Sequence, residues 1–466
     1  MAIVGAFVLP HPPLIIPAVG RGKERGIART VAACEEVARR VSALAPDTIV
    51  ISSPHTTLYR DYFHVSPGPG AKGSFAAYGA PEAAYEVTYD EELVRELVRE
   101  AQGEGLSLGT DYEREPRLDH ATMIAVHFVE QHLKEFKVVR IGLSGMAPKE
   151  HYLVGRCVQR AAEALGRRVV YLASGDLSHK LLATGPYGFA PEGPVFDERV
   201  CHDLASGDLC DLLAIDASVA ERAAECGLRS FQMMVGALDH TRVATELLSH
   251  EGPFGVGYGV ACLTLVGEAG ACAEIDRLGD YLRLREEDLR RRREEEDPYV
   301  RLARATIEAY VGKGKKIAIP RDLPAELLRE RAGCFVSLKI DGQLRGCIGT
   351  IAPVRTCLAE EIRDNAISAA TRDRRFMPVT AEELPDIVYD VDVLTPAQPI
   401  ASFDELDPSR YGVIVSASRG RRGLLLPDLD GVDTVEEQVR IAAQKGGIDI
   451  DYDDYRLERF EVVRHL

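Results

Sequence analysis

An apolar run that stops at a polar loop constrains the fold of this chain more than any other feature. Residues 169–173 are uniformly apolar, and the six residues that follow them, Ser174 to His179, read Ser-Gly-Asp-Leu-Ser-His. The pattern predicts a buried strand whose carboxyl end presents a polar loop, where α/β proteins usually place their chemistry. The alternative is an ordinary helix start, with Ser or Asp as the cap and His179 as a solvated residue of the first turn.

Two further histidines follow apolar runs in the same way. The stretch 3–9 ends just before His11, and a second apolar stretch over 47–53 ends just before His55. Between them, residues 21–44 carry apolar side chains at helical spacing. This order of strand, helix and strand predicts an α/β domain with a central, mostly parallel sheet and helices on both faces. The carboxyl ends of parallel strands converge at one edge of such a sheet.

Two later segments of this half are less regular. Residues 56–80 hold a Pro-Gly-Pro-Gly run and several aromatic residues, so we expect a long loop there. Residues 230–248 carry apolar side chains at helical spacing and predict a helix. Residues 256–266 form a glycine-spaced apolar run that predicts another strand.

Composition excludes several classes of function. A formal net charge of −17 argues against a general nucleic-acid binder, which needs a basic face. Ten cysteines without a CxxC pair, in a chain of 466 residues, argue against a disulfide scaffold and a zinc ribbon. The amino-terminal stretch looks like a first strand rather than a signal peptide, and no apolar run reaches the roughly 18 residues of a membrane span. We therefore expect a cytoplasmic protein without a membrane partner.

A change in composition predicts two domains. Residues 282–297 are mostly charged, with acidic and basic side chains interleaved. Because the signs cancel, we expect a solvated linker helix over 271–297 rather than a basic tail. The first domain then covers 1–270 and the second 298–466. The second mixes strands and helices without strand–helix–strand regularity, and its Asp341-Gly342 pair predicts a hairpin turn, so we expect a smaller α+β domain.

Four side chains of the first domain form a candidate site. His11, His55 and His179 follow strands, and Cys226 lies just before a predicted helix. Imidazole and thiolate ligands suit Fe(II), Cu or Zn better than Mg or Ca. Any one of these histidines alone is more simply a hydrogen-bonded loop residue, but three at strand ends favour a shared metal or redox site. We expect Asp176 to be the hydrogen-bond partner that orients His179.

The first domain also resembles the LigB-type class III extradiol ring-cleaving dioxygenases, whose scaffold the Memo proteins share. The motifs that carry the resemblance are Pro10-His11-Pro12-Pro13, Ser52-Ser53-Pro54-His55, Leu118-Asp119-His120-Ala121-Thr122 and Ser174-Gly175-Asp176-Leu177-Ser178-His179. The resemblance implies Fe(II) held by His11 and His55, with His179 as acid/base or fourth ligand. It also implies a small-molecule substrate, such as an aromatic diol, with His120 on the substrate side.

The third metal ligand departs from the dioxygenase pattern. Those enzymes use a late glutamate, whereas the matching position here is Cys226, as in the Memo proteins. A thiolate is a softer donor than a carboxylate and is itself oxidisable near O₂. The neighbouring Glu225 is a carboxylate, but it points about 100° away from Cys226 if the helix has already begun. The sequence therefore supports a metal or redox site more firmly than it supports ring cleavage, and Cu or Zn stay open beside Fe(II).

The second domain resembles the AMMECR family over nearly its whole length. The motifs are Leu344-Arg345-Gly346-Cys347-Ile348-Gly349, Asn365-Ala366-Ile367-Ser368-Ala369-Ala370, Asp373-Arg374-Arg375-Phe376, Gly423-Leu424-Leu425-Leu426-Pro427 and Gly431-Val432-Asp433-Thr434-Val435-Glu436-Glu437-Gln438-Val439. Arg345 and Cys347 share one side of a strand, so the cation could lower the pKa of the thiol and make a nucleophile. The alternatives are that Cys347 is a small buried hydrophobic residue, and that Arg345 anchors an anionic ligand or a carboxylate.

The fusion of both domains is similar to the AmmeMemoRadiSam system A proteins, a prokaryotic arrangement grouped with a radical-SAM protein. This resemblance implies a radical-SAM partner, and a homo-oligomer is compatible with the sequence. Two functions follow as hypotheses. The first is a non-haem iron oxidoreductase on the extradiol dioxygenase scaffold. The second is a Memo-like module that binds metal or uses its thiol without cleaving rings.

Overall fold

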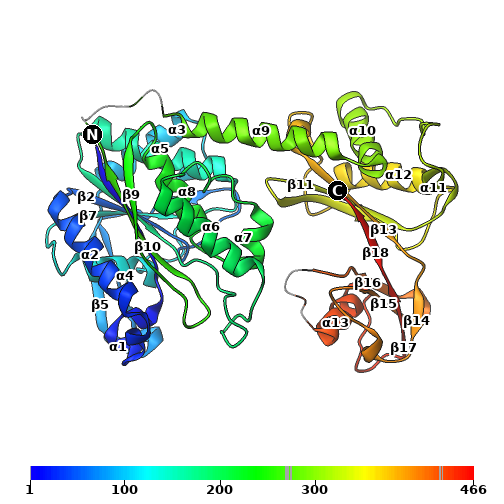
Figure 1. The fold of residues 1–466 in the computed structure, drawn as a ribbon, viewed down its shortest axis with the longest axis horizontal. Coiled ribbons are helices and arrows are strands. Elements are labelled where there is room, and N and C mark those ends of the chain that lie inside the picture. Colours follow the sequence, from blue (N-terminus) through cyan, green and yellow to red (C-terminus); the bar gives the residue numbers. More distant parts are fainter. Residues whose placement is uncertain (1, 268–271, 273–274, 430–431, 433) are drawn as a thin grey trace. The chain divides into compact units, whose positions relative to one another are not determined.

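The computed structural model describes residues 2–267, 272, 275–429, 432 and 434–466 (Figure 1). The chain divides into two compact units, residues 1–285 and 286–466. Helix α9 (Arg277–Glu295) begins in the first unit and ends in the second, and it lies within the predicted linker. The predicted boundary at 270–271 falls outside the described residues. Among the residues described, no helix combines the length and the apolar character needed to cross a membrane.

The first unit is built on a six-stranded sheet with the strand order β7-β2-β8-β1-β10-β9. Its parallel strands are β1 (Ile3–Leu9), β2 (Thr48–Ser53), β7 (Lys137–Gly142) and β8 (Val169–Ser174). Two antiparallel strands complete it, β10 (Tyr258–Leu265) and β9 (Val243–Glu251). The parallel strands are buried almost throughout, as their continuous apolar sequences require. The α/β class with a mostly parallel sheet is confirmed.

Helices cover both faces of this sheet, and each face has its own hydrophobic core (Figure 1). One core includes side chains of α2 (Ala28–Leu44) and α4 (His120–Val129). The other includes side chains of α3 (Glu91–Gly103), α5 (Pro148–Leu165), α6 (Glu192–Ser206), α7 (Ala217–Ala223) and α8 (Leu228–Ala237). Successive strand residues alternate between the cores, so Val8 packs into one core and Phe7 and Leu9 into the other. A single helical turn, α1 (Pro17–Gly20), follows β1.

Two of the predicted segments are wrong in part. The expected loop over 56–80 contains β3 (Phe63–His64), which pairs with β6 (Leu108–Gly109), and β4 (Gly70–Phe75), which pairs with β5 (Ala80–Thr88). The glycines of this segment favour a loop in the sequence pattern, but Gly70 is needed within the strand. A Cβ at this position would overlap the backbone carbonyl of Val87 on the paired strand.

The helix expected over 230–248 ends instead at Ala237, and β9 begins at Val243. The backbone between them turns through His240, whose φ is +51°, a left-handed conformation that no helix continues. In β9 the burial of Val243 to Glu246 alternates strictly, as expected of an edge strand with one solvated face. Val243 and Leu247 are four residues apart, so the same apolar residues also fit a helical spacing.

The second unit contains two four-stranded sheets. The strands of the first sheet are β12 (Gln343–Gly349), β11 (Cys334–Ile340), β13 (Val388–Leu394) and β18 (Val462–His465), in this order. The second sheet has β14 (Gln398–Ile400), β17 (Tyr455–Phe460), β15 (Gly412–Ala417) and β16 (Arg422–Leu425). The helices are α10 (Pro298–Lys313), α11 (Ala325–Arg329), α12 (Leu358–Thr371) and α13 (Val435–Lys445). The predicted hairpin at Asp341-Gly342 joins β11 to β12, and the α+β class is confirmed.

Helices α5 and α8 approach each other more closely than any side chain larger than hydrogen allows. A Cβ at Gly155 would overlap the carbonyl oxygen of Met233, and a Cβ at Gly236 would overlap that of Tyr152. The two glycines therefore determine how deeply α8 packs against α5. This matters for function because α8 begins two residues after Cys226.

Gly236→Ala is expected to destabilise the first unit by about 1–3 kcal/mol, because the added methyl group must push two packed backbones apart. Gly103→Ala is the matched control, since nothing lies within 4 Å of a Cβ at this other helical glycine. The free energy of unfolding of Gly103→Ala should equal that of the parent or exceed it by up to about 1 kcal/mol. Urea unfolding, followed by hydrogen exchange of peptides from the first unit, measures both, and equal effects of the two variants would contradict the close-packing argument.

Candidate metal centre

The predicted strand-end residues gather at the carboxyl edge of the parallel sheet. His11 lies two residues after β1 and His55 two residues after β2, while the loop after β8 carries Asp176 and His179. Imidazole rings of three different segments are in contact, since the ring centroid of His55 is 4.7 Å from that of His11 and 4.1 Å from that of His120. The topology of the sheet, rather than proximity in sequence, brings these groups together.

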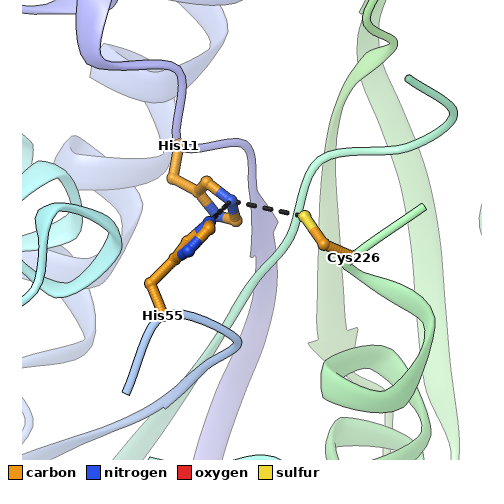
Figure 2. A group of neighbouring side chains, drawn as sticks. All are labelled: His11, His55 and Cys226. Carbon is orange, nitrogen blue, oxygen red and sulfur yellow. Dashed lines mark hydrogen bonds between the residues drawn. The ribbon is translucent and has the colours of Figure 1, made fainter. Parts of the chain in front are cut away.

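Three ligand atoms point toward one another at this edge (Figure 2). His11 Nε2 lies 3.0 Å from His55 Nε2 and 3.4 Å from Cys226 Sγ, and all three ligand atoms lie within 4.8 Å of one another. A metal ion about 2.0–2.3 Å from nitrogen and sulfur ligands, with angles of about 90–110°, separates those ligands by about 3–3.6 Å. The separations of His11 from His55 and from Cys226 therefore match those of ligands that share one transition-metal ion.

His11 is held by the loop after β8. Its side chain is buried, and its Nδ1 lies 3.0 Å from Ser174 Oγ. Its backbone N–H donates to Asp176 Oδ1 at 2.7 Å. If Nδ1–H donates to Ser174, the lone pair of Nε2 faces the other two ligand atoms, which is the tautomer that a metal ligand needs.

His55 is held by a chain of polar groups that reaches into the sheet. Its backbone N–H donates to Ser53 Oγ at 3.2 Å, and the Ser53 hydroxyl donates to Asp119 Oδ1 at 2.7 Å. Asp119 also caps α4 through the N–H of Thr122, and it lies 3.5 Å from the guanidinium of Arg140. Arg140 is almost completely buried in β7, so this chain ties His55 to the interior of the domain.

Cys226 reaches the site because the backbone of its loop approaches that of the β8 loop. A Cβ at Gly175 would overlap the Cα of Gly227, so both positions need glycine. The neighbouring Glu225 does not point at the other ligand atoms. Its carboxylate accepts the N–H of Leu228 at 2.6 Å, at the start of α8, where it is favoured by the helix dipole. Cys226 is thus the third side chain at the centre.

His120 and His179, the rim histidines, lie beside the ligand atoms and outside that group of three. The ring of His120 is 5.6 Å from that of His11, and its Nδ1 is 3.3 Å from Tyr78 Oη. The ring of His179 stacks on that of Tyr187, with 5.1 Å between centroids and 27° between planes. Asp176, which was expected to orient His179, instead bonds to the backbone of His11.

Burial drives the ionisable groups of the site toward their neutral forms. Burial, followed by the other histidines, holds the pKa of His11 well below its usual value. Burial lowers the pKa of each rim histidine to about 4. Burial, then Asp176 and Glu225, raises the pKa of the Cys226 thiol, and burial raises the pKa of Asp176 to about 7. Neutral imidazoles are the form that binds metal, and a bound cation would favour the thiolate.

Comparison with known proteins identifies the family of each domain. A family model described as the catalytic LigB subunit of aromatic ring-opening dioxygenase matches residues 5–261, more than half of the chain. The chain belongs to the LigB family. The AMMECR1 model matches residues 300–465, so the second unit is an AMMECR1 domain. Both predicted resemblances, and the fusion of the two domains, are confirmed.

Three relatives illustrate the match. Protein CA_C1420 of Clostridium acetobutylicum is 40% identical over 473 residues, covering 100% of this chain and 99% of its own length. A protein of Thermotoga maritima is 56% identical over 171 residues, covering 36% of this chain and 98% of its own length. The solved structure of an uncharacterized protein, PH0010 from Pyrococcus horikoshii, is 35% identical, covering 36% of this chain and 88% of that chain, with a TM-score of 0.34.

Arg345 and Cys347, the residues singled out in the AMMECR1 domain, do not contact each other through their side chains. Arg345 makes an ion pair with Glu383, with Nε 2.6 Å from Oε1. Cys347 Sγ accepts a hydrogen bond from Ser337 Oγ at 3.2 Å, and the cation that influences its pKa is Arg375. Burial outweighs these contacts and raises the pKa of Cys347. The geometry favours a half-buried, protonated thiol over an activated nucleophile.

Sequence reasoning missed several polar residues that build the centre. The sequence pattern indicates only a loop or cap residue at Ser174, and only strand residues at Ser53 and Arg140. Tyr78 and Tyr187 lie in segments without periodicity. Of these, only Arg140 carries a signal that could have been found, since a cation within an apolar strand needs a buried partner.

We expect the pKa of Asp176 to make the metal-free LigB domain less stable as pH rises. Its folded-state pKa of about 7 exceeds the usual 3.9, so the folded state binds more protons between about pH 4 and 7. Its contribution to stability is therefore lost as pH rises through that window. Asp176→Asn should gain about 2–3 kcal/mol relative to the parent between pH 5 and pH 8.

Urea unfolding in the presence of EDTA measures this difference, because the chelator removes any contribution of metal. Asp61→Asn is the control, since Asp61 is an exposed aspartate of the same unit. If the stability difference between Asp176→Asn and the parent does not change with pH, the pKa of Asp176 is not raised in the folded state.

Proposed function

We propose that the LigB domain is a metal-dependent oxidoreductase that binds Fe(II) through His11, His55 and Cys226 and acts on a small phenolic substrate. The single observation that carries the proposal is the convergence of three ligand atoms within 4.8 Å at the edge of the sheet. The description of the matching family as a ring-opening dioxygenase supports iron and an aromatic substrate. The soft thiolate also favours a transition metal over Mg or Ca.

Different residues of the domain would bind the metal and contact the substrate. His11 and His55 offer neutral imidazole nitrogens, and Cys226 gives up its proton when a cation binds. Fe(II) bound there would mediate the transfer of electrons from the phenolic substrate to O₂. His55 is solvent-exposed, so the centre is open to a ligand on that side. At pH 7 the rim histidines are neutral, because their pKa values are about 4, and each can accept or donate one hydrogen bond to a substrate oxygen.

A second function is favoured by one observation. The third ligand is the thiol of Cys226, and the nearby carboxylate of Glu225 is engaged in capping α8. A centre without a carboxylate differs from the facial triad of non-haem iron oxygenases. The domain could instead be a module that binds Fe or Cu, or uses its thiol, without cleaving rings. The radical-SAM partner implied by the fused architecture would then be the protein with which it acts.

Loss of any one ligand should release the metal. We expect protein purified without oxygen and loaded with Fe(II) to hold about one ion per chain, and His11→Ala, His55→Ala and Cys226→Ser each to weaken binding by at least about tenfold. His132→Ala is the control, because His132 is exposed and its imidazole is not part of the ligand group. Elemental analysis after desalting gives the metal content, and retention of iron in His11→Ala and His55→Ala would contradict the proposal.

Oxygen consumption separates the two functions. The iron-loaded protein is expected to consume O₂ with at least one member of a panel of catechols, and His179→Ala is expected to slow that consumption while keeping its iron, because the ring is outside the ligand group. An oxygen electrode and the ultraviolet absorbance of the ring report the reaction. Tight binding of Fe or Cu without oxygen uptake on any catechol would favour the binding module instead.

A further inference from the structure

Each rim histidine contacts one tyrosine that the proposed chemistry does not use. Tyr78 lies at the end of the short turn between β4 and β5, and Tyr187 lies in the loop between β8 and α6. Both phenols are exposed, at 42% and 58%. Tyr187 is among the groups that raise the pKa of Tyr78, after burial and Asp119, so the two side chains lie within electrostatic range of each other.

The contact of Tyr78 with His120 determines which ring nitrogen carries the proton. Tyr78 Oη lies 3.3 Å from His120 Nδ1, and the two rings meet nearly edge to face, at 65°. A phenol is a better donor than acceptor, and an imidazole nitrogen with a lone pair is a good acceptor. Donation by the hydroxyl leaves the proton of His120 on Nε2. His11 has the opposite pattern, because its Nδ1 faces the Ser174 hydroxyl and its Nε2 faces the ligand atoms.

The contact of Tyr187 with His179 uses the ring instead of the hydroxyl. The rings are stacked at 27°, and the hydroxyl of Tyr187 has no hydrogen bond among those found in the described part of the chain. Such a contact fixes the plane of the imidazole and covers one of its faces. The backbone N–H of His179 donates to the carbonyl of Ala223 at 3.0 Å, so both ends of this residue are held.

We propose that Tyr78 and Tyr187 are positioning residues that present the rim histidines to a phenolate or catecholate ligand. Tyr78 acts through its hydroxyl, which keeps a donor N–H on His120 Nε2 for an anionic oxygen of the ligand. Tyr187 acts through its ring, which holds His179 in place. Four planar side chains beside the ligand atoms favour a flat aromatic ligand, and the N–H donor favours a ligand with a negative oxygen. This inference rests on the proposed function and adds two positioning residues to its substrate site.

The test is the binding of 4-nitrocatechol to the full chain loaded with Fe(II) without oxygen, followed by the visible absorbance of the ligand. The two tyrosines should respond differently to loss of the hydroxyl alone. Tyr78→Phe is expected to weaken binding by about 3–10-fold, the value of one hydrogen bond. Tyr187→Phe should stay within about twofold of the parent, whereas Tyr187→Leu should weaken binding by about 3–10-fold, the value of one stacked pair.

Tyr112→Phe is the matched control, because Tyr112 is an exposed tyrosine of the same unit whose ring contacts Tyr62 rather than a rim histidine. Its binding constant should equal that of the parent. The iron content of every variant is measured in parallel. Equal effects of Tyr78→Phe and Tyr187→Phe, or parent-like binding by Tyr187→Leu, would overturn the assignment. Iron retention without any binding of 4-nitrocatechol would overturn the ligand class and leave the metal proposal standing.

A second measurement needs no metal. Nitrogen-15 spectra of the histidine-labelled, metal-free protein distinguish a ring nitrogen that carries a proton from one that does not, and His120→Asn identifies the signals of His120. We expect a protonated Nε2 and an unprotonated Nδ1 in the parent, and a mixture of tautomers in Tyr78→Phe. A proton on Nδ1 in the parent would overturn the role of Tyr78 whether or not the domain binds iron.

Discussion

The parallel pairing of β1 with β8 determines the geometry of the whole centre. It places Leu9 opposite Ser174, so the two chains leave the sheet side by side. The residues that follow then meet, and the backbone of His11 bonds to Asp176 while its ring contacts Ser174. A slip of one residue would turn Ser174 to the opposite face of the sheet. Strand β2 lies on the other side of β8, which brings the loop of His55 to the same edge.

The electrostatics of the centre follow from burying several ionisable groups together. Each can exist as a neutral group in the low-dielectric interior, and the pKa values of His11, Cys226 and Asp176 have all moved in that direction. A bound divalent cation would favour the thiolate form of Cys226, because it would compensate the negative charge that burial opposes. This compensation is the electrostatic basis of the proposed metal site.

The sequence predicted the sheet and the convergence of His11 and His55, because strand periodicity and the topology of parallel sheets are local signals with a global consequence. The place of Cys226 beside them was implied by the family resemblance, and His179, predicted to share the site, lies outside the ligand group. The sequence could not predict which side chain would contact which. Asp176 lies three residues from His179, yet it bonds to His11, which is 165 residues away, because a tight loop turns successive side chains in different directions. The ion pair of Arg345 with Glu383 joins residues 38 apart through the fold of the AMMECR1 domain. Contacts of this kind depend on tertiary packing, which periodicity does not encode.

The contrast between Cys226 and Cys347 shows why a conspicuous cysteine is a weak signal by itself. Burial raises the pKa of both thiols, so neither is a thiolate through its own surroundings. Cys226 has two imidazole nitrogens as neighbours, and the three atoms together can share a cation that would deprotonate it. Cys347 has the hydroxyl of Ser337 and the guanidinium of Arg375 nearby, and that cation is already paired with Asp373. The two thiols therefore differ in the neighbours that the fold supplies, and of these two only Cys226 lies beside imidazole nitrogens with which it would share the proposed cation.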